Sequence, residues 1–277
     1  VRCLTAAASA LSDGELGKQV EITSKDEIGQ LSQTFNKMSA ELARIDVQRK
    51  QLTADITHDL STPIQIISGY MEMLEEESIQ LTPKRIQIIR TELEHLRRLV
   101  SDLTTLSQVE GGALKLQTET FKPAELLQQI CDPYRPIAAS QEVELRFETD
   151  ARGRECELTA DPGRLLQTVQ NLIENALRYT PENGKITLTL GCKERNVKIS
   201  VRDTGVGIDA EDIPYVFDRF YRTDKSRNAN QGKMGLGLSI CKALTLAQGG
   251  KISVSSEGKG KGTTFELSFP AVPVQKP

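Results

Sequence analysis

Apolar residues recur at helical spacing through most of the first 112 positions of this 277-residue chain. A first stripe, Leu4, Ala8 and Leu11, stops at Asp13-Gly14. A second begins after Asp26-Glu27 and predicts another helix on one apolar face. Its members are Ile28, Leu31, Phe35, Met38 and Leu42. Two short amphipathic helices cannot bury both apolar faces alone, so we predict that this region dimerises. An ordinary helical hairpin is the alternative.

The helical pattern continues from Leu42 to Leu74 and predicts one long helix. Its stripe consists of Ile45, Leu52, Ile56, Leu60, Pro63, Ile67, Tyr70 and Leu74. The run EEESIQLTP interrupts it, and Thr82-Pro83 can cap and begin a new helix. The next stripe, which ends at Gly111-Gly112, consists of Ile89, Leu93, Leu96, Val100, Leu103 and Leu106. The two helices predict an antiparallel hairpin, and two hairpins form a four-helix bundle, so we expect a homodimer.

After Gly112 the pattern changes to that of a mixed α/β domain. Apolar and polar residues alternate in VELRF, ITLTL, VKISV, KISVSS and TTFELSF, which predicts half-buried strands. A helix, LLQTVQNLIENALRYT, is expected after Asp161-Pro162. The polar stretch between Phe220 and Leu236 predicts a long loop.

Composition narrows the class of protein. A hydrophobic content of 38% and a charged content of 26% are typical of soluble proteins, and a net charge of −3 gives no reason to expect nucleic-acid binding. Five cysteines without a CxxC pair indicate a reduced, cytosolic compartment. No apolar run approaches the ~18 residues of a membrane span. The chain begins with VRCL rather than Met, so we expect a soluble piece of a longer protein.

One of the two histidines lies in the segment DITHDLSTP, residues 55–63. His58 projects about 200° from Ile56 and is expected on the outward face. Near pH 7 a neutral imidazole offers a nucleophilic nitrogen, and a carboxylate such as Asp59 can fix its tautomer. Pro63 predicts a kink nearby. His95 is also expected to point outward, but no acid or proline follows it. The alternative for His58 is an exposed histidine with incidental neighbours.

A second group of polar residues follows Asp161-Pro162. Asn171, Asn175 and Arg178 share the helix face opposite the apolar stripe. Downstream come DTGVGI (203–208), FDRFYR (217–222) and GKMGLGLS (232–239). Each glycine-rich piece alone is a common turn. Their order behind an NxxxN helix is far more specific.

This ordered set resembles the ATP-binding domain of sensor histidine kinases. NLIENALRYT is similar to the N-box, DTGVGI to the first G-box, FDRFYR to the F-box and GLGLS to the second G-box. DITHDLSTP resembles the H-box, and DEIGQLSQTFNKM the second helix of a HAMP signal-relay module. The resemblance implies a multidomain chain with an all-α, dimeric amino-terminal part and an α/β carboxyl-terminal part. These are a HAMP module at 1–48 with a truncated start, a four-helix-bundle hairpin at 49–112, and a two-layer ATP-binding sandwich of the Bergerat type, as in DNA gyrase, at 113–277.

The resemblance also implies the chemistry of the H-box. His58 would take a phosphoryl group from MgATP and pass it to an aspartate of a response regulator, with Asp59 as its carboxylate partner. Thr62, three residues after Asp59, would position water for dephosphorylating that regulator. The alternative for Thr62 is a surface hydroxyl bonded back to a carbonyl. The chain would be a homodimer and the cytoplasmic part of a protein anchored in the membrane by an upstream sensor segment.

For the nucleotide, the resemblance implies that Asp203 accepts the adenine amino group and that Gly205 and Gly207 let the backbone approach the base. Asn175 would bind Mg²⁺, with Asn171 helping directly or through water. Residues expected around the phosphates and ribose are Arg178, Tyr179, Tyr221 and Arg222, with Lys225 and Arg227 as weaker candidates. The segment Gly235, Leu236, Gly237 and Leu238 would begin a helix whose amides favour phosphate. Residues 223–234 would form a mobile lid.

Four positions depart from the family pattern. Arg178 stands where Lys is usual, Asp59 where Glu is commoner, Ser61 where Arg is common, and Met234 where a small residue is usual. None removes a required chemical group. Two other functions stay open: a related ATPase or serine kinase without phosphohistidine, and a non-catalytic or phosphatase-dominant dimeric relay.

Overall fold

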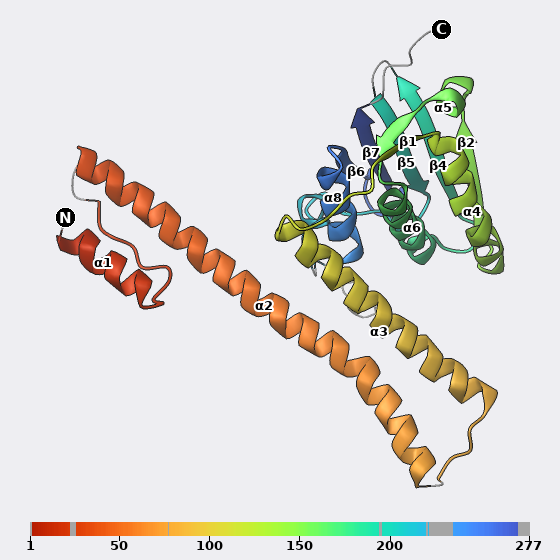
Figure 1. Cartoon of the computed structure of the whole chain (residues 1–277), viewed down its shortest axis with the longest axis horizontal. Coiled ribbons are helices and arrows are strands. Elements are labelled where there is room, and N and C mark those ends of the chain that lie inside the picture. Colours follow the sequence, from red (N-terminus) through yellow and green to blue (C-terminus); the bar gives the residue numbers. More distant parts are fainter. Residues whose placement is uncertain are drawn as a thin grey trace. The chain divides into compact units, whose positions relative to one another are not determined.

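The computed structural model describes residues 2–22, 26–76, 78–193, 196–219, 221 and 235–270. The chain divides into two compact units, residues 1–65 and 66–277. The first contains α1 (Arg2–Ser12) and most of α2 (Glu27–Glu75), drawn in red and orange in Figure 1. Among the described residues, no helix combines the length and apolarity needed to cross a bilayer.

The two amino-terminal helices predicted around a connector are confirmed. Asp26 caps α2, because its Oδ1 accepts hydrogen bonds from Ile28 N at 3.1 Å and Gly29 N at 3.2 Å. The side-chain amide of Asn36 holds the connector: Val20 N donates to Asn36 Oδ1 at 2.7 Å, and Asn36 Nδ2 donates to Val20 O at 2.8 Å. These bonds tie the connector to α2. Dimerisation of this region stays a prediction.

Helix α2 continues through Pro63 as one element, and α3 (Pro83–Glu110) follows after a short link. Pro63 is buried and has no N–H to donate to the carbonyl of Asp59. The kink expected there stays a prediction. The start of α3 at Thr82-Pro83 is confirmed, because Thr82 Oγ1 accepts from Arg85 N at 3.4 Å, and α3 ends at Gly111 as predicted.

All five predicted strands occur and form one sheet in the order β2-β4-β5-β7-β6. They are β2 (Glu144–Thr149), β4 (Lys185–Lys193), β5 (Asn196–Asp203), β6 (Lys251–Ser255) and β7 (Thr264–Pro270). The β2–β4 pair is parallel and the other pairs are antiparallel. A separate two-stranded sheet joins β1 (Glu119–Phe121) to β3 (Leu158–Ala160).

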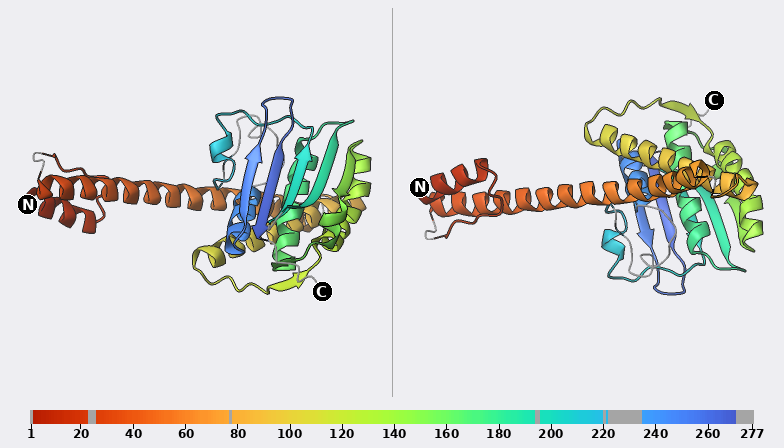
Figure 2. Two further views of the ribbon diagram at one scale, coloured as in Figure 1. Left: turned by 90° about the horizontal axis from the view of Figure 1, so that it is seen from above. Right: turned by 90° about the horizontal axis from the view of Figure 1, so that it is seen from below.

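Helices α4 (Pro123–Ser140), α6 (Pro162–Tyr179) and α8 (Gly237–Ala247) cover one face of this sheet (Figures 1 and 2). The short α5 (Ala151–Glu155) and the 3-10 turn η1 (Ile213–Tyr215) complete the described elements of this domain. The predicted two-layer α/β sandwich is therefore confirmed. Helix α4 was not predicted; Pro133 and Pro136 inside it hide its helical pattern.

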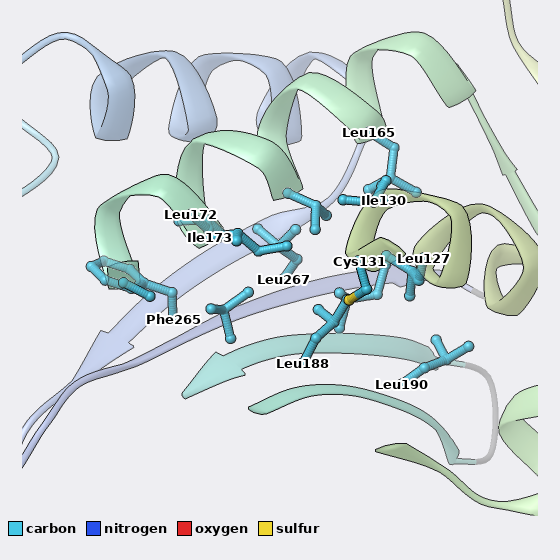
Figure 3. Close-up of a cluster of buried hydrophobic side chains, with 14 of the residues drawn as sticks. Leu127, Ile130, Cys131, Leu165, Leu172, Ile173, Leu188, Leu190, Phe265 and Leu267 are labelled. Atoms are coloured by element: carbon cyan, nitrogen blue, oxygen red, sulfur yellow. The ribbon is translucent and has the colours of Figure 1, made fainter. Parts of the chain in front are cut away.

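The core lies between these helices and the sheet (Figure 3). Helix α6 contributes Leu165, Leu172 and Ile173, while α4 contributes Leu127, Ile130 and Cys131; Leu188, Leu190, Phe265 and Leu267 come from the strands. Burying each such side chain stabilises the fold by roughly 1.5–3 kcal/mol. Because the apolar face of α6 points into this core, its polar face, which carries Asn171, Asn175 and Arg178, points away from the core.

All five cysteines are free thiols, and their burial differs. Cys3 on α1 is exposed, Cys192 is intermediate, and Cys131, Cys156 and Cys241 are buried. Burial raises the pKa of Cys131 to about 11 and that of Cys156 to about 12.

Candidate active site

His58 projects from α2 into solvent, with 80% of its side chain exposed. Its Nδ1 lies 3.0 Å from Asp59 Oδ1. An ionised carboxylate can only accept a hydrogen bond, so Nδ1 carries the proton and donates it to Asp59. The lone pair then lies on Nε2, the outer ring nitrogen. The outward orientation predicted for His58 is confirmed.

Three hydroxyl groups near His58 bond back to the carbonyls of α2. Thr57 Oγ1 donates to Thr53 O at 2.8 Å, and Ser61 Oγ donates to Thr57 O at 2.7 Å. Thr62 Oγ1 donates to His58 O at 3.2 Å, which is the geometry of the alternative considered for Thr62. That long bond uses the hydroxyl proton and leaves the oxygen lone pairs able to accept from a water. The role of Thr62 in positioning water stays a prediction.

The outward orientation predicted for His95 is wrong. Its side chain is only 19% exposed, and Nε2 is buried with no hydrogen-bond partner among the described residues. Nδ1 lies 3.7 Å from Glu92 Oε2. The outer nitrogen of this ring is therefore shielded, whereas that of His58 lies in solvent.

A cavity of about 150 Å³ opens in the second unit where β5, α6 and α8 meet. Most of the nucleotide-binding residues expected from the sequence line it: Asn171, Asn175, Arg178, Tyr179, Asp203, Gly207, Tyr221, Gly235, Gly237 and Leu238. Residues separated by almost 70 positions are thus brought together. In the parts of the chain that the structure covers, no three His, Cys, Asp or Glu side chains gather closely enough to hold a metal ion.

Asp203, at the end of β5, supplies a buried carboxylate to this cavity. Its Oδ1 accepts from Gly205 N at 2.8 Å and from Thr263 N at 3.1 Å. Burial raises the pKa of the Asp203 carboxyl, and these two N–H bonds partly oppose that rise. Because both bonds fall on Oδ1, Oδ2 can accept from an N–H of a ligand.

Contacts within the protein give a second reason for glycine at positions 205 and 207. A Cβ at Gly205 would overlap the carbonyl oxygen of Tyr179, and a Cβ at Gly207, whose φ is +70°, would overlap that of Gly258. The two glycines therefore allow close approach of backbone to backbone within the protein. Their role in letting the backbone approach a base stays a prediction. Gly207 lines the cavity and Gly205 does not.

Amide groups and a helix terminus form the polar side of the cavity. Asn171 and Asn175 lie one turn apart on α6, and α8 begins at Gly237 with its first amides beside them. Asn171 Nδ2 is buried without a hydrogen-bond partner among the described residues. Buried polar groups are nearly always paired, so this amide is suited to a polar ligand. The amino terminus of α8 favours an anion.

Leu236 and Tyr221 differ from the expected arrangement, and three expected contacts lie outside the described residues. Leu236 is buried in the core and N-caps α8 instead of lining the cavity. The Tyr221 hydroxyl donates to Asp212 Oδ1, and its ring packs 5.7 Å from that of Tyr215. These three are Arg222, Lys225 and Arg227; Met234 and the rest of the expected lid, residues 223–234, also lie outside the described residues.

Family models match three consecutive parts of the chain. Residues 2–44 match the HAMP domain, 48–112 the His Kinase A (phospho-acceptor) domain, and 160–273 the histidine kinase-, DNA gyrase B- and HSP90-like ATPase. The phospho-acceptor match contains His58, and the ATPase match contains the whole cavity. The chain belongs to the sensor histidine kinases.

Known sensor histidine kinases resemble the chain over most of its length. It is 32% identical over 268 residues to the signal transduction histidine-protein kinase BaeS of Escherichia coli (strain K12), covering 96% of this chain but 57% of that protein. The structure of histidine kinase ThkA in complex with response regulator protein TrrA matches with a TM-score of 0.62 at 26% identity, covering 84% of this chain and 65% of that one. Full-length ShkA in complex with AMPPNP matches with a TM-score of 0.60 at 28% identity, covering 80% and 46%.

Four residues that line the cavity of this sensor histidine kinase were not predicted as ligand contacts: Val206, Ile208, Val216 and Thr263. Val206 and Ile208 belong to DTGVGI, where they alternate with the glycines that carry the motif. Thr263 precedes β7 in the run KGTTF, so its place after a glycine was an available signal. Val216 follows η1 and carried no signal of its own.

Proposed function

We propose that the chain is the cytoplasmic portion of a membrane sensor histidine kinase. It phosphorylates His58 from MgATP and transfers the phosphoryl group to an aspartate of a response regulator. The observation that carries this proposal is the exposed His58 ring, held through Nδ1 by Asp59, within a segment that matches the phospho-acceptor domain. The complex of the similar kinase ThkA with a response regulator supports the choice of partner.

The cavity is suited to an adenine nucleotide. Asp203 Oδ2 accepts from the adenine amino group, and Val206 and Ile208 supply apolar walls for the ring. The first amides of α8 and the cation of Arg178 attract the phosphates. The AMPPNP complex of the similar kinase ShkA supports the nucleotide class.

The asparagines of α6 are suited to a hard cation. Amide oxygens are among the ligands that Mg²⁺ accepts, and Asn175 would hold it, with Asn171 directly or through water. Bound Mg²⁺ would neutralise charge on the phosphates. The buried Asn171 Nδ2 has no partner among the described residues; as a hydrogen-bond donor it suits an acceptor such as a phosphate oxygen, which leaves the amide oxygen of Asn171 for the cation or its water.

His58 acts as the nucleophile. The Nε2 lone pair forms a bond to the γ-phosphorus, the bond from that phosphorus to the bridging oxygen breaks, and ADP leaves. Asp59 holds the Nδ1 proton and stabilises the positive charge that develops on the ring. A regulator aspartate then attacks the phosphorus, and the P–N bond breaks to restore neutral His58.

Dephosphorylation of the regulator is a second activity of the same helix. Thr62 lies one turn beyond His58 on the exposed side of α2, and its oxygen keeps lone pairs beside its bond to His58 O. There it can orient a water toward a phospho-aspartate.

The domain boundaries proposed are 1–48, 49–112 and 113–277. The ATPase family model begins at residue 160, but α4 contributes Leu127, Ile130 and Cys131 to the same core as α6. Strand β2 pairs with β4 in the same sheet. The catalytic domain therefore includes the segment before residue 160.

The test is phosphorylation with γ-radiolabelled ATP, comparing wild type, His58→Ala and His95→Ala. We expect an acid-labile, base-stable label on wild type and His95→Ala and none on His58→Ala, which should still bind ADP. A label that persists in His58→Ala contradicts the assignment. Acid-stable label on wild type indicates a serine kinase, and no label with no ADP binding indicates a non-catalytic relay.

A further inference from the structure

The loop that joins β6 to β7, residues 256–263, runs along the base-binding loop, residues 203–208. Hydrogen bonds connect the two segments in sequence from end to end. They are Asp203 N to Thr263 O at 2.9 Å, Thr263 N to Asp203 Oδ1 at 3.1 Å, Gly262 N to Gly205 O at 3.1 Å, Gly260 N to Val206 O at 2.7 Å, and Ile208 N to Ser256 Oγ at 3.0 Å. The base-binding loop thus takes its shape from the 256–263 loop.

The two loops touch through their backbones. A Cβ at Gly207 would overlap Gly258 O, and a Cβ at Gly262 would overlap Asp203 O. Most of the contact between the two loops is therefore made by backbone N–H and C=O groups. Among the bonds just given, one uses a side chain of the 256–263 loop, and that side chain is Ser256.

The hydroxyl of Ser256 is fully engaged. It accepts from Ile208 N at 3.0 Å and, more weakly, from Gly258 N at 3.4 Å, and it donates to Gly262 O at 2.7 Å. It therefore holds its own loop closed and fixes the far end of the base-binding loop. Ile208 lines the cavity and packs against the core, so its position sets one apolar wall.

A second contact lies just beyond this point. Lys259 Nζ is 2.6 Å from Asp209 Oδ2, with the two side chains 62% and 40% exposed. Exposed ion pairs of this kind contribute little. Ser256, half-buried and bonded on three sides, is the more effective anchor.

We propose that Ser256 is a positioning residue for adenine recognition, which holds Val206 and Ile208 in place against the base through the Ile208 amide. The inference rests on the proposed binding of ATP in this cavity. Without the hydroxyl, the Ile208 N–H loses its acceptor and the loop relaxes, so the apolar wall moves away from the ring. The phosphate side of the cavity, formed by α6 and α8, is unaffected.

The test compares Ser256→Ala with wild type, with Ser255→Ala as the matched control. Ser255 is the exposed last residue of β6. One lost hydrogen bond corresponds to roughly 5- to 10-fold in an equilibrium constant. We expect Kd for ADP and KM for ATP to rise by about that factor, while phosphorylation at saturating ATP stays within about twofold. Ser256→Thr, which keeps the hydroxyl, should restore most of the affinity.

Selectivity between ATP and GTP distinguishes a specific effect on the adenine-binding wall from a general loss of nucleotide binding. A misplaced adenine wall should weaken ATP more than GTP, so the ATP-to-GTP preference should fall in Ser256→Ala; equal losses for both nucleotides overturn the inference. Ser256→Cys fills similar space with a weaker acceptor and should lie between Ala and wild type, which keeps the test valid if Ser256→Ala folds poorly. Wild-type affinity in both variants overturns this inference alone. Absence of ADP binding by wild type overturns the proposed function with it.

Discussion

The carboxyl group of Asp203 is buried at the end of β5, where the N–H groups of Gly205 and Thr263 hold it. Burial raises its pKa above the ordinary value of 3.8. A carboxyl with a raised folded-state pKa contributes stability at low pH, and that contribution is lost as the pH rises through the folded-state pKa. At pH 7 the ionised Asp203 therefore lowers the free energy of unfolding, although this is the form proposed to accept a hydrogen bond from the adenine amino group.

Asp203→Asn separates these two effects. The amide oxygen can still accept from Gly205 and Thr263, but an NH₂ group now faces the adenine amino group, donor against donor. We expect ADP affinity to fall by about 10-fold or more. Urea unfolding should show that the variant gains stability relative to wild type as the pH rises from 4 to 7. A relative loss over that range would contradict the sign derived for Asp203.

Thr62 supplies neither the nucleophile nor a contact to the nucleotide. Thr62→Ala should therefore leave His58 phosphorylation nearly intact and remove most acceleration of regulator dephosphorylation. The measurement is phosphate release from pre-phosphorylated regulator in the presence of ADP. Thr57→Ala is the control, since its hydroxyl makes the same kind of bond, to Thr53 O. If kinase and phosphatase rates fall together in Thr62→Ala, the hydroxyl is structural.

At the scale of elements, α6 joins the core to the site. Its amino terminus is fixed by Asp161, whose Oδ1 caps Arg164 N at 3.0 Å and whose Oδ2 accepts from Gln117 N at 2.8 Å. Asp161 is nearly fully buried. One side chain thus holds the helix and the segment before β1 together.

Asp161→Ala should destabilise the domain substantially. Loss of the cap costs about 1 kcal/mol, and loss of the second bond, from the N–H of the exposed Gln117, costs about 0.5–1.5 kcal/mol more. Asp150→Ala is the control: Asp150 caps the five-residue α5 at an exposed position, so we expect at most about 1 kcal/mol. Denaturant unfolding measures both. Equal losses would mean that burial of Asp161 adds nothing to its cap.

The sequence predicted the elements whose signals are local. Helices α2, α3 and α6 carry long apolar stripes with capping residues, and the five sheet strands alternate clearly. Strands β1 and β3, with three residues each, are too short to alternate. His95 was misjudged because a helical projection places a residue relative to its own helix, whereas burial depends on neighbours. The packing role of Gly205 and Gly207 was not predicted, because Tyr179 and Gly258 are distant from them in sequence.

At the scale of the whole molecule, α3 carries an apolar seam that the described chain leaves half exposed. Ile86, Leu93 and Val100 lie seven residues apart and are exposed, and Ile89, Leu96 and Leu103, also seven apart, are half-buried. Apolar residues repeating in this way pack helices against one another in bundles. A second copy of the chain can cover this seam, as the predicted homodimer requires.

Sedimentation equilibrium tests that assembly. Wild type should sediment at twice the mass of the chain. The double variant Leu93→Glu with Val100→Glu should sediment at the mass of one chain, because dimerisation would bury two unpaired carboxylates per subunit. Thr91→Glu, on the opposite side of α3, should stay dimeric. A wild type that sediments as a single chain at micromolar concentration would remove the homodimer from the proposal.

The unequal burial of the five thiols gives the molecule a ready attachment point for probes. Thiol reagents attack the thiolate, so the raised pKa values of Cys131 and Cys156 and the burial of Cys241 slow their modification. Cys3, exposed on α1, should accept a maleimide fluorophore first. Two dyes on the Cys3 residues of a dimer would then report the spacing of the HAMP helices by energy transfer, without mutation of the chain.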